Sequence, residues 1–237
     1  MARVGRIASA WRYPVKSMAA EPLESAPVTL QGVQADRMYA FVQAGSPSPF
    51  PWLTGRELPA MLRHQPRWSD DQRPRVLVRT PAGDELPIDS DDLRLHLERA
   101  AERPVYLLPN YRGSFDVAAI TLMSDATVAH IAAASGTPEE PLRFRMNFYV
   151  ETEDRQPWCE NGWVGHTLRL GDSVRVAITE RDKRCAMITL APHGGDPLTR
   201  VLTVVANENE AMAGVYASVL TPGVVRPGDE VFIEDPA

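Results

Sequence analysis

The chain has 237 residues, of which 44% are hydrophobic and 24% are charged, and its formal net charge is −6. These values exclude a disordered chain and allow one large domain or two small ones, each with its own hydrophobic core. The negative charge argues against nucleic acid as the main partner.

The first residues of the chain show no targeting signal. Residues 1–7 read MARVGRI, without the apolar run of a secretory signal or a pair of arginines, and no stretch of the sequence reaches the length of a membrane span. We therefore expect a cytoplasmic protein with no membrane partner. The two cysteines, Cys159 and Cys185, cannot form a disulfide framework and lack the spacing of a zinc site, which agrees with a reducing compartment.

Runs of β-branched and aromatic residues, bounded by turn residues, recur along the chain and predict strands. They comprise residues 75–79, 104–108, 142–150, 168–178, 185–190, 215–220 and 230–233. Two segments predict helices: Ser90 caps a helix that begins at Asp91, and Ser124 caps a helix over residues 125–134 that ends at Gly136. Many short strands with two or three helices favour a β-rich α+β fold built on barrels over alternating βαβ units.

Two segments rich in Gly, Ser, Pro and Asn predict loops. Residues 44–51 predict an exposed loop that we expect to shape substrate entry, and residues 109–114 predict a linker. We place a domain boundary near residue 110, which gives domains over residues 1–110 and 111–237. A ligand held between them would lie at a domain interface, a common place for cofactor pockets.

Several familiar sites are missing from the sequence. It has no glycine-rich dinucleotide fingerprint, no P-loop, no His-Glu-x-x-His motif and no nucleophile elbow. The five histidines are scattered singly, which gives no local support for a histidine metal cage, and we expect His166 and His193 at the surface. A cysteine hydrolase that uses His193 stays open, because only the fold could bring it to a cysteine.

Cations and small polar side chains remain as candidate ligand-binding groups. Arginine forks bind anions through two hydrogen bonds, whereas lysine supplies a point charge, so such a set could hold a phosphate or another anion. In the predicted strand over residues 142–150, Arg143 and Arg145 share one face, with Phe144 and Met146 opposite, so both arginines should face water or a ligand. The candidate anion-binding residues are Lys16, Ser17, Arg37, Arg145, Asn147 and Arg184.

The most informative cysteine follows two cations. Cys185 comes directly after Lys183 and Arg184, and a thiolate beside positive charges has a lowered pKa and is a good ligand for a soft metal. Packing is the alternative, because free cysteines are often buried and inert. Cys159 has no cationic neighbours, so we expect it to lie in a turn without a functional role.

Seven short blocks in order give the chain a resemblance to the MOSC proteins, named for the C-terminal domain of molybdenum cofactor sulfurases. In the first half, residues 10–17 (AWRYPVKS), 32–39 (GVQADRMY) and 52–59 (WLTGRELP) resemble the family's N-terminal β-barrel domain. In the second half, the blocks that resemble the MOSC domain itself are residues 120–124 (ITLMS), 143–147 (RFRMN), 183–185 (KRC) and the tail from 214 to 229. The resemblance therefore assigns these two domains to residues 1–110 and 111–237.

Within the family the chain is similar to the mitochondrial amidoxime-reducing component, and this likeness implies a molybdenum–molybdopterin cofactor with Cys185 as the metal ligand and catalytic residue. It further implies reduction of N-hydroxylated small molecules or related N- and S-oxides. Because nothing in the chain supplies electrons, a separate flavin or iron–sulfur reductase is an expected partner. The residues that match cofactor-holding positions are Lys16, Ser17, Arg37, Thr121, Ser124, Arg145, Asn147 and Arg184.

The chain departs from the family pattern near these positions. Met146 stands where relatives usually have proline, residues 180–183 (ERDK) replace a small polar or cysteine-containing run, and residues 188–192 (ITLAP) thin out a threonine-rich segment. These changes are compatible with the cofactor and bear mainly on the substrate.

Two other function classes stay open on the same residues. A carrier or sulfur-transfer protein would use Cys185 as a persulfide or hand over a molybdenum species, and it would need no anion cradle. A cofactor-free barrel that binds a small anionic metabolite would keep its ligand affinity in a Cys185→Ala variant.

Overall fold

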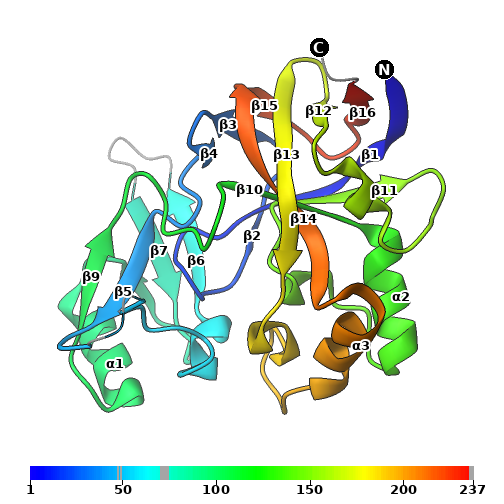
Figure 1. The fold of residues 1–237 in the computed structure, drawn as a ribbon. Coiled ribbons are helices and arrows are strands. Elements are labelled where there is room, and N and C mark those ends of the chain that lie inside the picture. Colours follow the sequence, from blue (N-terminus) through cyan, green and yellow to red (C-terminus); the bar gives the residue numbers. More distant parts are fainter. Residues whose placement is uncertain (47, 49, 70–74, 235–237) are drawn as a thin grey trace.

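The computed structural model describes residues 1–46, 48, 50–69 and 75–234. Within this part, the larger lobe is a closed barrel and the smaller lobe combines short sheets with one helix (Figure 1). The expected β-rich α+β fold built on a barrel is confirmed. Both ends of the described chain lie together at the top of the barrel lobe (Figure 1).

Seven strands close the barrel in the order β11-β10-β14-β13-β12-β16-β1, with β1 pairing β11 to complete the ring. Only the β10–β11 pair is parallel among the described barrel strands. Apolar side chains such as Ile7, Leu122 and Val176 fill the interior. The barrel strands are β1 (Ala2–Arg12), β10 (Ile120–Ser124), β11 (Phe148–Thr152), β12 (Thr167–Leu170), β13 (Val174–Lys183), β14 (Met212–Thr221) and β16 (Glu230–Glu234).

The N-terminal strand belongs to the barrel of the C-terminal half. β1 pairs with β11 and β16, and Gly5 is required there because a Cβ would lie 2.0 Å from the carbonyl oxygen of Glu151. A second link joins β3 (Ala26–Thr29) to both β4 (Gly32–Val33) and β15 (Gly223–Val225). A cut near residue 110 would therefore not separate the two lobes, because strands from before the cut complete sheets formed after it.

The smaller lobe packs its own core around Phe41, Val78 and Leu93. Ser90 caps its helix α1, with the side chain accepting a hydrogen bond from the amide of Leu93, as the sequence predicted. The short strand β2 connects the lobes, since it pairs with β1. The elements here are β2 (Glu21–Pro22), β5 (Tyr39–Gln43), η1 (Pro59–Arg63), β6 (Gln65–Ser69), β7 (Arg75–Arg79), β8 (Glu85–Pro87), α1 (Asp91–Ala101) and β9 (Val105–Pro109).

Two helices pack together at the lower end of the barrel lobe (Figure 1). α2 (Asp125–Ser135) has the predicted caps, with Ser124 at its start and Gly136 in a left-handed conformation at its end. α3 (Thr199–Asn209) was not predicted. It has no side-chain cap, and its β-branched residues favour a strand, but Val201 and Val205 recur at helical spacing and are buried.

Two predicted strands are wrong. Residues 142–147 form the short helix η2 (Pro141–Arg143) and a turn, and the strand β11 begins only at Phe148, because Arg145 has a left-handed backbone that a strand does not allow. Residues 185–190 form the short helix η4 (Ala186–Thr189), which the hydroxyl of Thr189 closes by donating to the Ala186 carbonyl. A further short helix of the barrel lobe is η3 (Cys159–Trp163).

Of the predicted loop over residues 44–51, positions 47 and 49 lie outside the described residues. Residues 110–119 run between β9 and β10 and cross from one lobe to the other (Figure 1). Among the described residues, no helix combines the length and apolar character needed to cross a bilayer.

Candidate functional site

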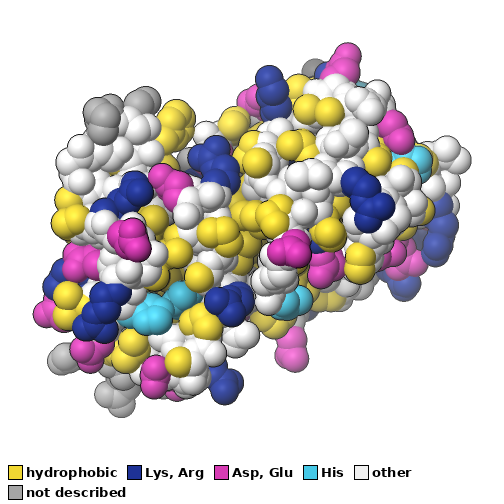
Figure 2. Space-filling view, turned by 90° about the horizontal axis from the view of Figure 1, so that it is seen from below, with side chains coloured by type: hydrophobic (Ala, Val, Ile, Leu, Met, Phe, Trp, Pro, Cys, Tyr) yellow, Lys and Arg dark blue, Asp and Glu magenta, His cyan; other side chains and the backbone are white. Residues whose placement is uncertain are grey.

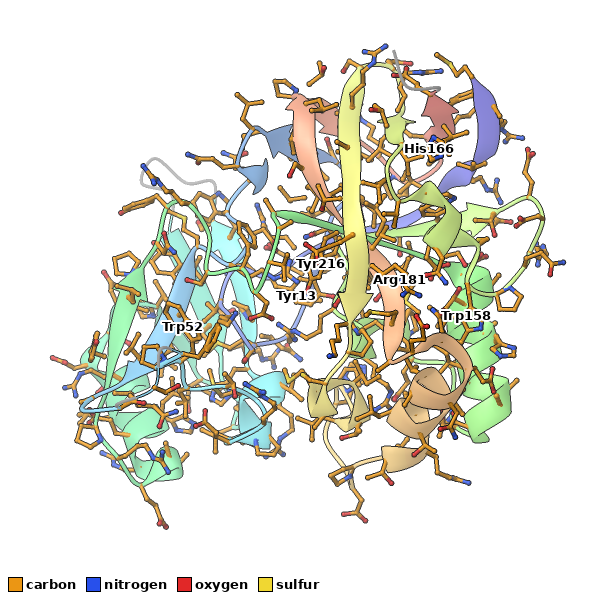
Figure 3. All side chains as sticks on the ribbon, viewed as in Figure 1. Tyr13, Trp52, Trp158, His166, Arg181 and Tyr216 are labelled. Carbon is orange, nitrogen blue, oxygen red and sulfur yellow. The ribbon has the colours of Figure 1, made fainter. Side chains whose placement is uncertain are left out.

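Tyr13 marks the centre of the candidate site, between the two lobes (Figure 3). It follows directly on β1 and is fully buried, with its amide donating to the Oδ1 atom of Asp36 over 2.7 Å. Two guanidinium groups stack on its ring, that of Arg37 at 4.3 Å and that of Arg145 at 4.4 Å from the centroid. Residues from both halves of the sequence therefore meet on one aromatic ring.

Arg37 is held by the turn before β5 and by the loop before β11. Its guanidinium forms an ion pair with Asp36 and donates to the Arg145 carbonyl at 2.7 Å. The Asp36 carboxylate also accepts from Asn147 Nδ2 at 3.0 Å, and the Asn147 amide oxygen accepts from the hydroxyl of Thr121. Burial lowers the pKa of Arg37, but the charge and hydrogen bond of Asp36, together with Tyr13 and Asp116, outweigh burial, and the pKa is raised overall.

Lys16 reaches the site from the turn after β1. Its Nζ atom donates to the Ser114 carbonyl and to the Asp116 carboxylate, both at 2.8 Å, and lies 5.9 Å from the ring centroid of Trp52. Burial lowers the pKa of Lys16, whereas Asp116 opposes that shift. For Asp116 burial acts to raise the pKa, but Lys16 and the nearby arginines hold it below its ordinary value.

Arg184 follows β13 and points inward. Its guanidinium forms an ion pair with the buried Asp182 and donates to the Phe144 carbonyl. Burial raises the pKa of Asp182 despite that ion pair, and it raises the pKa of Tyr216, which hydrogen-bonds Asp182. The Nε atom of Arg184 is buried and has no hydrogen-bond partner within the described residues.

These groups form what we call the cationic cluster, and their charges do not balance. Three of its cations are paired with carboxylates, whereas Arg145 has neither an ion pair nor a side-chain hydrogen bond to the residues that the structure describes. Burial, and then the neighbouring Arg37, lower the pKa of Arg145 to about 10. A half-buried cation that pairs with no anion among the described residues indicates a place for an anionic ligand. The cluster comprises Tyr13, Lys16, Asp36, Arg37, Asp116, Arg145, Asp182 and Arg184.

The backbone is strained at three of the predicted site residues. Ser17, Arg37 and Arg145 have φ angles of 66°, 47° and 59°, in the left-handed region that non-glycine residues rarely adopt. Such strain collects at functional sites, where the rest of the fold holds it in place. Arg145 adopts this conformation in a turn, and its own carbonyl accepts a hydrogen bond from Arg37.

Cys185 lies at the edge of this cluster, directly after Arg184. It is exposed and stands at the start of η4, whose Met187 touches the smaller lobe: a Cβ on Gly55 would lie 2.9 Å from Met187 Cε. The loop around Gly55 thus packs on the segment that carries the cysteine. Arg184 directs its guanidinium to Asp182 and Phe144, so the neighbouring cation in the sequence is committed to other groups.

Ser124 lies in a second buried polar group, which we call the Glu160 network. Its hydroxyl caps α2 and donates to Thr127 Oγ1, which in turn donates to Glu160 Oε2 at 2.8 Å. The other oxygen of Glu160 accepts from the amide of Gly214, and the Trp158 amide donates to Thr127. The structure therefore brings Thr121 to the cationic cluster through Asn147, whereas the hydrogen bonds of Ser124 lie in the Glu160 network.

Sequence reasoning missed the aromatic and acidic members of the cluster. Tyr13 and Asp36 stand beside residues that were predicted, but nothing local indicated that Tyr13 would carry two guanidiniums or that Asp36 would join three chain segments. Asp116 lies two residues after the predicted linker over residues 109–114, and Tyr216, which hydrogen-bonds the cluster member Asp182, lies on β14. A weak signal existed in Asp182, two residues before Arg184, since that spacing brings the opposite charges together.

A cavity of about 600 Å³, the interlobe cavity, opens beside the cluster. Tyr13 and Arg145 belong to its wall, and the remaining lining comes from β2 and the turn before it, η1, the β6–β8 sheet, η2 and the loop after η4. Seen from below, hydrophobic side chains lie along the join of the lobes with Lys and Arg side chains near it (Figure 2). His193 lines this cavity whereas Cys185 does not, so the cavity does not bring together the pair that a cysteine hydrolase needs.

Comparison with known proteins gives two family matches that run almost end to end along the chain. The sequence model of the MOSC N-terminal beta barrel domain matches residues 4–105, and that of the MOSC domain matches residues 110–232. No curated protein gives a significant match.

Solved structures with a similar fold include the YuaD protein from Bacillus subtilis and YiiM from two bacteria. YuaD is 11% identical with a TM-score of 0.49, over 96% of this chain and 94% of that one. YiiM from Geobacillus stearothermophilus is 14% identical with a TM-score of 0.40, over 73% and 71% of the two chains. YiiM from Escherichia coli is 15% identical with a TM-score of 0.36, over 51% and 56%.

Proposed function

The chain belongs to the MOSC family, and from that premise we propose that it is a molybdenum-cofactor-dependent oxidoreductase. The substrates we propose are N-hydroxylated compounds or related N- and S-oxides, with Cys185 as the metal ligand. The observation that carries this proposal is Arg145, a half-buried cation that forms no ion pair with a described residue, beside three cations that each have one.

The residues of the cationic cluster fit an anionic, phosphate-bearing cofactor such as molybdopterin. Arg145 offers an uncommitted guanidinium, and Arg184 offers a buried Nε–H group without a partner among the described residues. Arginine forks and lysine are the side chains that bind phosphate best in proteins. Cys185 adds an exposed sulfur at the edge of the same cluster, and a thiolate is a suitable ligand for a soft metal.

When bound, the cofactor supplies two-electron chemistry that removes an oxygen atom from the substrate. The chain's own residues do the positioning. Arg145 and Lys16 would neutralise the negative charge of the cofactor. Asp36 holds the Arg37 side chain through an ion pair, which keeps the Arg37 guanidinium stacked on the Tyr13 ring. Tyr13, with a pKa raised to about 12 by burial, stays neutral and provides the ring on which both arginines rest.

A separate electron donor completes this proposal. Neither cysteine has the partners that an iron–sulfur cluster requires, and the chain carries no dinucleotide fingerprint, so electrons would come from a flavin or iron–sulfur protein. Reduction of an N-hydroxylated compound needs two electrons and two protons and releases water. This donor would supply the electrons, and the solvent would supply the protons.

The test is elemental analysis for molybdenum, paired with pterin fluorescence after oxidation, on protein made in cells that produce the cofactor. We expect near-stoichiometric metal in the wild type, loss of metal in Cys185→Ala and retention in the matched control Cys159→Ala. Cys159 is a fair control because it is half-buried and burial raises its pKa to about 11, which disfavours the thiolate. Well-folded wild-type protein with neither metal nor pterin would contradict the proposal.

The exposure of Cys185 supports a second candidate, a carrier or sulfur-transfer protein in which this cysteine bears a persulfide. Sulfur transfer needs an accessible cysteine but no anion cradle. Alanine at Arg37 or Arg145 should therefore leave sulfur transfer intact if this candidate holds. Under the reductase proposal the same variants should lose the cofactor.

A further inference from the structure

We propose that the interlobe cavity binds the substrate through an anionic group, a carboxylate or a phosphate, attached to an apolar body. This inference rests on the proposed function, because it names the class of substrate that the neighbouring site would reduce. The cavity has a volume of about 600 Å³, within the range of small-molecule sites, and it touches the cationic cluster at Tyr13 and Arg145.

The charges that line the cavity are positive on balance. Four arginines and two glutamates face it within the described chain, although the protein as a whole carries a net charge of −6. Both glutamates are already paired: Glu21 lies 2.8 Å from the Arg12 guanidinium, and Glu85 lies 3.6 Å from that of Arg67. A cleft lined by one sign of charge concentrates ligands of the opposite sign.

The remaining arginines are available. Arg63, at the end of η1, and Arg79, at the end of β7, are exposed and form no ion pair or side-chain hydrogen bond with other residues that the structure describes. They place two uncommitted guanidiniums on the cavity wall, and Arg145, which the proposed function assigns to the cofactor, belongs to the same wall. A carboxylate or phosphate matches the fork geometry of arginine, whereas a neutral ligand would leave these charges without partners.

Most of the uncharged lining is apolar, and part of it is stiff. Four prolines from four separate segments contribute, and proline fixes its own backbone, so the cavity walls need little ordering when a ligand enters. Two leucines add further apolar surface. The prolines and leucines of the lining are Pro22, Leu62, Pro66, Pro81, Leu142 and Pro192.

The cavity is distinct from the residues assigned to the cofactor. Lys16, Ser17, Arg37 and Cys185 do not line it, so among the site residues Arg145 is shared by both places. A substrate seated in the cavity would therefore lie against the cluster without displacing what Lys16 and Arg37 hold.

The experiment compares matched probes by isothermal titration calorimetry, on cofactor-free and on loaded protein. The probes are 4-carboxybenzamidoxime, its neutral methyl ester and the corresponding phosphate monoester, which distinguishes carboxylate from phosphate as the preferred group. The variants are Arg63→Gln and Arg79→Gln, alone and combined. Arg99→Gln on α1 is the control, since it is exposed on the same lobe and does not line the cavity.

We expect the wild type to bind at least one anionic probe about tenfold more tightly than the ester, which corresponds to about 1.4 kcal/mol. Each single variant should lower that preference about threefold, the double variant should abolish it, and Arg99→Gln should keep it. Equal binding of all three probes to the wild type would overturn the proposal, as would a loss in Arg99→Gln equal to that in Arg79→Gln.

Loading the protein separates this inference from the proposed function. The anion preference should be the same with and without cofactor, and a preference found only in cofactor-free protein would mean that the cavity holds the cofactor, which overturns the inference. Turnover with a chemical reductant is measured separately. Anion-selective binding without turnover by the loaded protein would contradict the proposed reduction and leave the anion preference of the cavity standing.

Discussion

The cationic cluster and the Glu160 network are both buried polar groups, but they differ in how completely they are satisfied. In the Glu160 network each carboxylate oxygen accepts from a donor that the fold supplies, and no cation is involved. In the cationic cluster one guanidinium has no ion pair with a described residue, and two members, Arg37 and Arg145, have left-handed backbones. A closed polar network stabilises a fold, whereas one with an uncompensated charge is prepared for a ligand.

The largest effect should come from removing the carboxylate at the centre of the closed network. We expect Glu160→Ala to lower the free energy of unfolding by about 3 kcal/mol, because the Thr127 hydroxyl and the Gly214 amide would lose a buried acceptor. Urea unfolding measures this change. The molybdenum content per folded molecule should stay at the wild-type level, and a selective loss of metal from folded protein would break the contrast between the two regions.

The opposite pattern is expected at Arg145. Arg145→Met should leave stability unchanged or raise it by about 1 kcal/mol, because it removes a half-buried cation that has no ion pair with a described residue and lies near Arg37. At the same time it should lower the affinity for sulfate at least tenfold, measured by the rise in Tm with sulfate at constant ionic strength. The exposed Arg155→Met is the matched control. Strong destabilisation with unchanged sulfate binding would show that Arg145 is structural.

Ser124 tests whether a residue that resembles a cofactor ligand serves only as a helix cap. We expect Ser124→Ala to cost about 1 kcal/mol, the usual value for a lost N-cap, and Ser90→Ala at α1 to cost a similar amount. Differential scanning calorimetry compares the two variants. Cofactor content should be unaffected in both, and loss of pterin in Ser124→Ala alone would return Ser124 to the cofactor site.

The smallest effect is a pH dependence. Burial raises the pKa of Glu160 above its ordinary 4.5, so the folded protein binds this proton more tightly than the unfolded chain does. Stability from this group is therefore present below about pH 4.5 and is lost as pH rises through the raised folded value. As pH rises over that interval, the free energy of unfolding of the wild type should fall relative to that of Glu160→Gln. If the unfolding free energies of the two proteins changed with pH in parallel, the raised pKa of Glu160 would be contradicted.

Errors in local structure did not keep Arg145 from the cationic cluster. Arg145 was predicted to face a ligand from strand alternation, yet residues 142–147 are not a strand and the neighbouring Arg143 is buried against Glu140 and the Ile188 carbonyl. Arg145 reaches the cluster through a left-handed turn. Alternation failed because Pro141 begins a short helix, which hydrophobic pattern alone does not distinguish from a strand in so short a segment.

The sequence by itself determined the features that depend on neighbouring residues. Caps at Ser90 and Ser124, turn-bounded strands and the barrel class follow from local hydrogen bonding and side-chain periodicity, and the ordered motifs indicated the family. Only the tertiary structure decided that β1 closes the barrel of the other half, that Tyr13 carries two guanidiniums, and that Arg145 alone among the cluster's cations lacks a carboxylate. Charge balance in a buried site depends on residues far apart in the chain, such as Lys16 with Asp116 and Asp36 with Asn147, and their proximity is set by the packing of the two lobes.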